Sequence, residues 1–458
     1  MSSLNSLPTP ATRRLGLLAL GLATLLPMLG GSLANMVLPA LGQAFAVPFA
    51  SLQWVLVAYL LGITCLTVVA GRLGDRFGRR RLLLLGLGLF ALASLLCALA
   101  PTIGWLIAAR ALQGIAAACM LSLALAMVGQ LVPPARRGWG MGLLGTLSAC
   151  GTALGPSFGG LLTASFGWQA PFLLLVPLSL LALGCARLGL PRDDCSPQEE
   201  GMNLASLSLL VAALLCYGLA LTLGGALALW WGAGALLVTG SFIRRERRAP
   251  VPLLPLALLG APGLSNGLLA SALVASVMVL TLLIGPFYLR GVFGLGLGTV
   301  GLMISGGPLL AALTGMPAGW LVDRLGARQV VRLGLAVMGA AALGLAGAAG
   351  QFGPLGYLLP ILLLTAGYAL FQTANNSAVV GEASEQTRGA VAGLLTLSRN
   401  LGQLTGVAGL GGLFAALVGE QGLTLASELV FGNRALFALS ALLIGLAFWL
   451  VGRRREGM

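Results

Sequence analysis

Apolar stretches of about 20 residues recur along the whole chain and are separated by short polar or Pro/Gly-rich breaks. A helix of that length crosses the hydrocarbon core of a lipid bilayer. The pattern therefore predicts an all-α membrane protein with fourteen transmembrane helices. These helices are expected at residues 15–41, 51–72, 82–100, 104–128, 138–163, 169–190, 203–222, 226–243, 263–290, 298–321, 331–349, 355–380, 388–417 and 435–452.

Polar segments divide the predicted helices into groups of six, two and six. We expect an N-terminal six-helix bundle over residues 1–190, a linker with two additional transmembrane helices over 191–260, and a C-terminal six-helix bundle over 261–458. The middle pair has no counterpart elsewhere in the chain and therefore looks like an insertion.

The two outer groups repeat each other in sequence. Residues 71–87 read GRLGDRFGRRRLLLLGL and residues 319–335 read GWLVDRLGARQVVRLGL, with Gly, Leu, Asp-Arg, Gly and Arg in register. A second, weaker match pairs Gly151, Gly155 and Gly160 with Gly402, Gly406 and Gly411. Pseudo-symmetric bundles of this kind are built by transporters, with the substrate site near the bilayer midplane between them.

Composition and charge support a lipid environment. Of the residues, 58% are hydrophobic and 8% charged, against about 45–50% and about 25% in soluble domains. All 26 basic residues are arginines, and most of them lie in short clusters between the apolar stretches, where they act as topology signals rather than as a nucleic-acid surface. Their distribution predicts cytoplasmic N- and C-termini in a multi-pass protein of the plasma membrane, which in a bacterium is the inner membrane.

Several chemistries are disfavoured by the residues that the chain lacks. It has no His and no C-x-x-C pair, so we expect neither a metal site nor another cofactor. No acidic residue lies well inside a predicted helix, which argues against a membrane enzyme. A phosphate-cradling loop is absent, as is any Lys, which argues against an ATP-driven pump.

The predicted loop after the second helix carries the strongest motif. It contains Gly71, Leu73, Asp75, Arg76, Gly78, Arg79 and Arg80, and a degenerate copy contains Gly319, Asp323, Arg324 and Gly326. This pattern resembles that of the major facilitator superfamily, and the chain looks closest to its fourteen-helix drug:proton antiporters. The resemblance implies that the loop stabilises the state closed to the cytoplasm. The alternative is a basic loop that only sets the topology.

Two further motifs match the same family. Arg110 and Gln113 fit its R-x-x-Q-G element, and because a charged residue inside a membrane span is costly, Arg110 is expected to face a wet cavity. The alternative is that the Arg110 side chain extends toward the outer surface of the membrane. Gly151, Gly155 and Pro156 fit G-x-x-x-G-P-x-x-G-G, which provides a groove for close helix packing and a bend. Within the family this element marks antiporters.

Other polar residues inside the spans are candidates for the substrate cavity. For each single amide, a hydrogen bond between helices is as good an explanation as substrate contact, but the set favours a cavity lining. Together with Arg110 and Gln113, the candidates are Asn35, Gln53, Gln372, Asn375, Asn376, Arg399 and Gln403.

One departure from the family pattern concerns proton coupling. Related exporters usually carry an Asp early in the first helix, and this chain has Gly30 there. The resemblance nevertheless implies a secondary active exporter of small lipophilic compounds or drugs, working by alternating access with proton antiport. The alternative is an organic-anion exporter or facilitator that protons do not drive. The expected partners are a small-molecule substrate, the lipid bilayer and, as a candidate, protons; nucleic acid is not among them.

Overall fold

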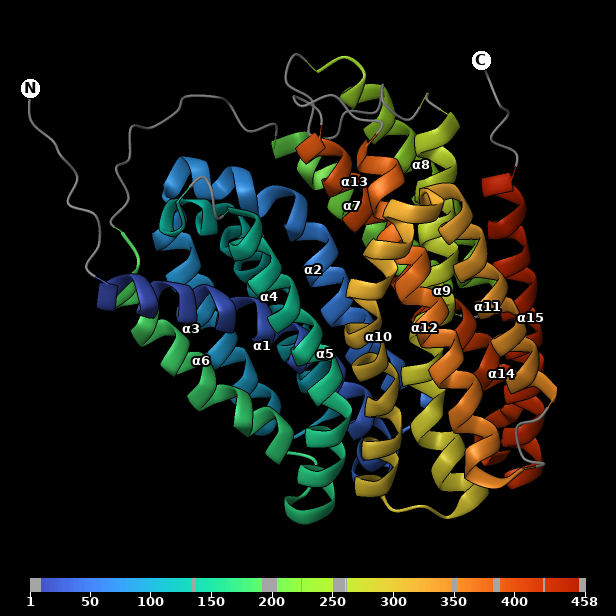
Figure 1. The fold of residues 1–458 in the computed structure, drawn as a ribbon. Helices are drawn as coiled ribbons and strands as arrows, with labels where there is room; N and C mark the ends of the chain where they lie inside the picture. The colour runs from blue at the N-terminus through green and yellow to red at the C-terminus, as the bar shows by residue number, and fades with distance from the viewer. Residues whose placement is uncertain are drawn as a thin grey trace, which may run out of the picture.

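The computed structural model describes residues 10–133, 137–191, 204–223, 225–249, 260, 262–347, 352–381, 388–422 and 425–452. The described chain is helical almost throughout (Figure 1). Its helices are α1 (Pro10–Phe45), α2 (Phe49–Phe77), α3 (Arg79–Ala98), α4 (Ile103–Leu131), α5 (Arg137–Phe166), α6 (Ala170–Gly189), α7 (Leu204–Thr222), α8 (Gly225–Glu246), α9 (Pro262–Phe293), α10 (Leu297–Leu325), α11 (Ala327–Gly347), α12 (Gly353–Gly381), α13 (Arg388–Thr405), the π-helical segment η3 (Gly406–Leu410), α14 (Gly411–Gly422) and α15 (Ala426–Gly452).

A helix lies at each of the fourteen predicted positions, and α13, η3 and α14 together occupy one of them. In the described part of the chain, 13 helices are long and apolar enough to cross a membrane. Helix α5, with 30 residues, is not among them, although at about 1.5 Å per residue it has the length to cross. Its many glycines lower its hydropathy.

The helices form two bundles with an extra pair beside them. Figure 1 shows α1–α6 tilted against the more upright α9–α15. In the first bundle α1 packs on α4, α5 and α6, and in the second α9 packs in the same way on α12, α13 and α15. Helix α8 packs on α7, and α7 packs on α2 and α13. The predicted domain boundaries near residues 190 and 260 adjoin segments outside the described residues.

The repeated loop has the same backbone in both halves. Gly78 joins α2 to α3 with φ 96°, and Gly326 joins α10 to α11 with φ 83°. Each donates its N–H to the carbonyl four residues earlier, on Gly74 and Val322 respectively. Because side chains strongly disfavour positive φ, glycine is required at both positions.

Arg80 and Arg328, which occupy equivalent positions in the repeat, tie the ends of each bundle together. Arg80 donates to the carbonyl of Arg187 in the last turn of α6, at 2.7 Å. Arg328 donates to the carbonyl of Gly452 at the end of α15, at 3.3 Å. We call the end of the molecule where α1 begins and α15 ends the proximal end, and the opposite end the distal end.

The buried apolar side chains form two cores. One core fills the C-terminal bundle and continues into the distal part of the N-terminal bundle, through residues such as Leu41, Phe49 and Leu52. The other is confined to the proximal part of the N-terminal bundle, with Leu20, Leu87 and Met127 among its members. The two bundles therefore share a core at their distal ends, whereas the proximal part of the first bundle has a core of its own.

Candidate functional site

Polar and aromatic contacts close the distal end between the two bundles. Ser157 Oγ on α5 donates to Ser305 Oγ on α10 at 2.6 Å. Arg290 on α9 donates to Gln43 on α1 at 3.5 Å. The ring of Phe49 meets the rings of Phe287 and Phe414 in edge-to-face geometry, with centroid distances of 5.1 and 5.7 Å. These contacts join helices of the N-terminal bundle to helices of the C-terminal bundle.

Gln53, a predicted cavity residue, contributes to the same closure. Its side chain is 2% exposed and donates from Nε2 to the Val407 carbonyl at 3.3 Å. Val407 lies in the π-helical segment η3, where the backbone is locally widened. Gln53 therefore links α2 of one bundle to η3 of the other.

The glycine repeat organises equivalent helix contacts in the two bundles. A Cβ on Gly151 or Gly155 would collide with α1, and a Cβ on Gly402 or Gly406 would collide with α9, the equivalent helix. The third glycine of each set faces the opposite bundle: Gly160 meets Leu297 and Gly301 of α10, and Gly411 meets Gln53. The weaker of the two sequence matches thus reflects a common packing scheme.

Pro156 lies inside α5, where it cannot donate a backbone hydrogen bond. Its carbonyl approaches Gly301 of α10 so closely that a Cβ on Gly301 would collide with it. The predicted groove of α5 therefore receives α1 on one side and α10 on the other.

Arg110 is fully buried inside the N-terminal bundle, at 0% exposure. Its Nε donates to the Val55 carbonyl of α2 at 3.1 Å, and its Nη1 donates to the Gly30 carbonyl of α1 at 3.3 Å. Nη1 also bonds Gln113 Oε1, while the guanidinium carbon lies 4.1 Å from the centre of the Tyr59 ring. Arg110 thus joins α1, α2 and α4 through their interior.

Gln113 extends this network, since its Nε2 donates to Ser94 Oγ on α3 at 2.8 Å. Both motif residues are buried in this conformation. Gly30, the position where the family resemblance implies an Asp, lies against the same network: a Cβ there would be 3.9 Å from Gln113 Nε2. The position of the missing carboxylate therefore adjoins the buried arginine.

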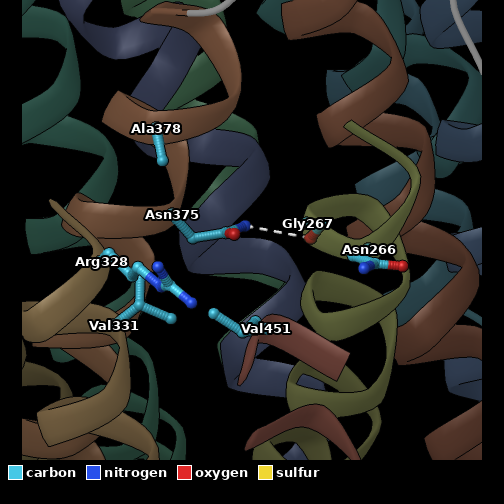
Figure 2. A pocket seen from close by; sticks show the side chains of 7 residues that line it. All are labelled: Asn266, Gly267, Arg328, Val331, Asn375, Ala378 and Val451. Atoms are coloured by element: carbon cyan, nitrogen blue, oxygen red, sulfur yellow. Dashed lines mark hydrogen bonds between the residues drawn. The ribbon is translucent and has the colours of Figure 1, made fainter. Parts of the chain in front are cut away.

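Asn35 and Asn375 are buried amides that bond to helix backbones. Asn35 Nδ2 donates to the Gly31 carbonyl at 3.2 Å, while its buried Oδ1 has no partner among the residues that the structure describes. Asn375 Nδ2 donates to the Gly267 carbonyl of α9 at 3.1 Å. Figure 2 shows this bond beside a small hollow at the proximal end of the C-terminal bundle, lined by Asn266, Gly267, Arg328, Val331, Asn375, Ala378 and Val451.

The remaining predicted cavity residues form two polar stripes. On α12, Tyr368, Gln372 and Asn376 follow each other at intervals of four residues and share one helix face. On α13, Arg399 and Gln403 share a face in the same way. Helices α12 and α13 pack on each other.

The loop motif lies at the proximal end. Gly71 and Arg76 belong to the last turns of α2, and Arg79 Nη1 donates to the Ala126 carbonyl of α4 at 3.5 Å. Asp323 is exposed in the last turn of α10. The side chain of Asp75 lies outside the described residues, so its predicted role in the clamp stays a prediction.

Some connecting residues were missed by the sequence analysis. Ser157 and Ser305 carried no motif signal. Tyr217 on α7 bonds Thr405 on α13 at 2.6 Å, which attaches the extra pair to the C-terminal bundle. The equivalence of Arg80 and Arg328 follows from the sequence repeat, because both occupy the same position in the aligned segments 71–87 and 319–335. Within the described residues no cluster of three potential metal ligands occurs.

Comparison with known proteins places the chain among transporters. The family model for the Major Facilitator Superfamily matches residues 20–407 and 267–457. The uncharacterized transporter YebQ of Escherichia coli (strain K12) is 32% identical over 410 residues, which are 87% of this chain and 89% of that protein. The tetracenomycin C resistance and export protein of Streptomyces glaucescens is 29% identical over 420 residues, 88% of this chain and 76% of that protein.

The fold is also that of solved transporters. The crystal structure of a bacterial homolog of the human lysosomal transporter Spinster matches with a TM-score of 0.71 at 16% identity, covering 97% of both chains. The sequence match over most of the chain and the shared helical architecture lead to one conclusion. The chain belongs to the Major Facilitator Superfamily and is a multi-pass membrane transporter, not an enzyme.

Proposed function

We propose that this protein is a secondary active exporter of small lipophilic compounds and works by alternating access from the cytoplasm to the outside. The likeness to the tetracenomycin C resistance and export protein supports export as the direction. The arginine distribution supports cytoplasmic termini, so the proximal end faces the cytoplasm and the distal end faces outward.

The observation that carries this proposal is the unequal closure of the two ends. At the distal end the bundles share one apolar core, together with hydrogen bonds such as those of Ser157 and Gln53. At the proximal end the first bundle has a separate core. In the proposed topology this is the state closed to the outside, and transport requires the distal contacts to open while the proximal ends approach each other.

Proton antiport is the coupling that the family resemblance favours, and we include it in the proposal. No acidic residue lies well inside a predicted span, so the coupled proton would bind near the cytoplasmic face, at Asp75, Glu382 or Glu385, or on the substrate itself. The second candidate function, an organic-anion exporter or facilitator without proton coupling, is favoured by the same lack of a membrane carboxylate and by Arg110 and Arg399 inside the spans.

Efflux from proteoliposomes that contain the purified chain tests this function. Vesicles loaded with neutral, anionic or cationic amphipathic dyes are compared with protein-free vesicles, with and without an imposed pH gradient. We expect protein-dependent efflux of at least one dye, accelerated by the gradient if protons are coupled. Efflux that the gradient leaves unchanged would favour the second candidate, and no protein-dependent movement of any dye would contradict the exporter.

A further inference from the structure

We infer that the substrate is an amphipathic organic anion whose carboxylate binds Arg399, on the face that α12 and α13 share. This inference rests on the proposed export function and specifies its substrate class. It follows from how the two intramembrane arginines differ in their surroundings, from the polar residues around Arg399, and from the distribution of acids along the chain.

Helix α13 is held in one orientation by contacts with α9. Ser398 Oγ donates to the Leu268 carbonyl at 2.5 Å, and Gly402 packs so closely that a Cβ there would collide with Ala272. Ser398 and Gly402 thus define the face of α13 that is buried against α9. Arg399 is rotated from Ser398 by about 100° around the helix, since an α-helix has 3.6 residues per turn, and points to a different side.

That side of α13 is not fully covered by other helices. Ala392 is exposed, and the residues one, two and three turns further along the stripe, Thr396, Arg399 and Gln403, are partly exposed. Arg399 lies 11 residues from the start of α13, or about 16 Å along the helix axis. An accessible stripe of polar residues at this depth has no reason to face lipid tails.

Arg399 makes no hydrogen bond or ion pair within the described part of the chain. The helix α12 that packs beside it carries Tyr368, whose phenol is uncharged at neutral pH. Arg110 differs, because it is completely buried and donates to the carbonyls of Val55 and Gly30 and to Gln113. Arg110 has a structural set of partners, whereas the donors of Arg399 are available to a ligand.

A carboxylate matches these donors best. The guanidinium group presents a planar fork of N–H donors that can bond both oxygens of a carboxylate. Gln372 and Asn376 on α12 and Gln403 on α13 provide further donors and acceptors along the two stripes for polar groups of the substrate. A cation on this face would meet the charge of Arg399 at low dielectric constant and be repelled.

If the substrate is an anion, the membrane potential contributes a driving force for its export. All twelve acidic residues fall outside the spans predicted from the sequence, so the predicted spans contain no carboxylate that could exchange a proton for the substrate. The membrane potential of a negative-inside compartment favours the exit of a monoanion, and this adds to any coupling to protons. At equilibrium, about 59 mV corresponds to a tenfold ratio of monoanion across the membrane.

The experiment uses proteoliposomes of the full chain loaded with dansylglycine, a carboxylate, or with dansylglycinamide, its neutral amide. A potassium diffusion potential is imposed with valinomycin. We expect anion efflux to increase when the potential drives anions outward. Arg399→Gln is expected to lower anion efflux at least tenfold while leaving amide efflux within about twofold, and Arg399→Lys to restore part of the anion efflux.

Arg434→Gln is the matched control, since Arg434 is an exposed arginine at the distal end of the same bundle. It is expected to transport the anion normally. Thermal unfolding of each purified variant separates loss of binding from loss of folding. Normal anion efflux by a folded Arg399→Gln variant would overturn the inference. So would a wild-type protein that exports the amide, or the cation ethidium as a third probe, but not the anion. In each case the exporter function would survive. A chain that moves none of the three probes would overturn the exporter function itself.

Discussion

Arg110 shows how one side chain can join three helices inside a membrane bundle. Its Nε and Nη1 atoms reach carbonyls on two different helices while Nη1 also bonds Gln113. Only a branched, planar donor group can satisfy partners in several directions at once. The geometry therefore predicts that charge alone is not sufficient at this position.

Replacing Arg110 by Lys tests this requirement. A single ammonium group cannot reach both Val55 and Gly30, and each lost hydrogen bond to a charged group costs about 1.5–3 kcal/mol. We expect Arg110→Lys to lower the thermal unfolding midpoint of the purified protein and to reduce efflux at least tenfold, and Arg110→Ala to abolish efflux. A Lys variant with wild-type melting and efflux would contradict the geometric requirement.

Gly155 is a position where packing against α1 excludes any side chain. A Cβ there would collide with Ser32, and forcing extra atoms into such a contact costs about 1–3 kcal/mol or more. We expect Gly155→Val to impair efflux several-fold and to destabilise the protein. Gly445→Val is the control, because Gly445 is exposed with no atom near its missing Cβ. Equal tolerance of the two substitutions would mean that α5 does not pack as described.

At the scale of the element, we expect the two copies of the loop motif to be equally sensitive to substitution of the glycine that links their helices. Gly78 and Gly326 both have positive φ, which costs other residues about 1–2 kcal/mol. We expect Gly78→Ala and Gly326→Ala each to lower the free energy of unfolding by about that amount, measured by denaturation in detergent. Gly71→Ala, whose added methyl group meets no atom, should be neutral. A neutral Gly78→Ala would exclude a backbone role for this glycine.

Helix positions and the internal repeat could be predicted because both are local patterns. Span length depends on hydropathy, and the repeat is a match in register, confirmed by the equal backbone of Gly78 and Gly326. The partners of polar residues could not be predicted in this way. Arg110 and Arg399 look alike in sequence, and their difference depends on which carbonyls come within reach after the helices pack.

The same limit applies to the amides. Gln53 and Asn375 were both candidates for the cavity, yet Gln53 bonds the opposite bundle and Asn375 bonds α9 within its own bundle. Each bond joins residues more than a hundred positions apart in the chain. The helix rotations that decide such pairings are set by packing, for example by the glycines facing α1 and α9, rather than by local sequence.

At the scale of the whole molecule, the proposed alternating access would require the distal contacts to separate in every cycle. Ser157 and Ser305 lie on opposite bundles with their hydroxyl oxygens 2.6 Å apart, close enough for a disulfide after substitution by Cys. We expect the oxidised Ser157→Cys/Ser305→Cys variant to lose efflux and to regain it after reduction. The single-Cys variants, treated with the same oxidant, control for the native thiols. Unimpaired efflux by the cross-linked protein would contradict the proposed movement.

Helix α7 lies across the seam between the two bundles, and its contacts there are of different kinds. On the C-terminal side, Tyr217 bonds Thr405; on the other, Gly218 lies against the apolar side chain of Leu61, with 3.3 Å from its missing Cβ to Cδ1. A hydrogen bond depends on direction and fixes the position of its partner, whereas an apolar contact allows the two helices to slide along each other. We therefore expect the extra pair α7 and α8 to move with the C-terminal bundle while α2 slides along α7, so that this side stays covered toward the lipid throughout the proposed cycle.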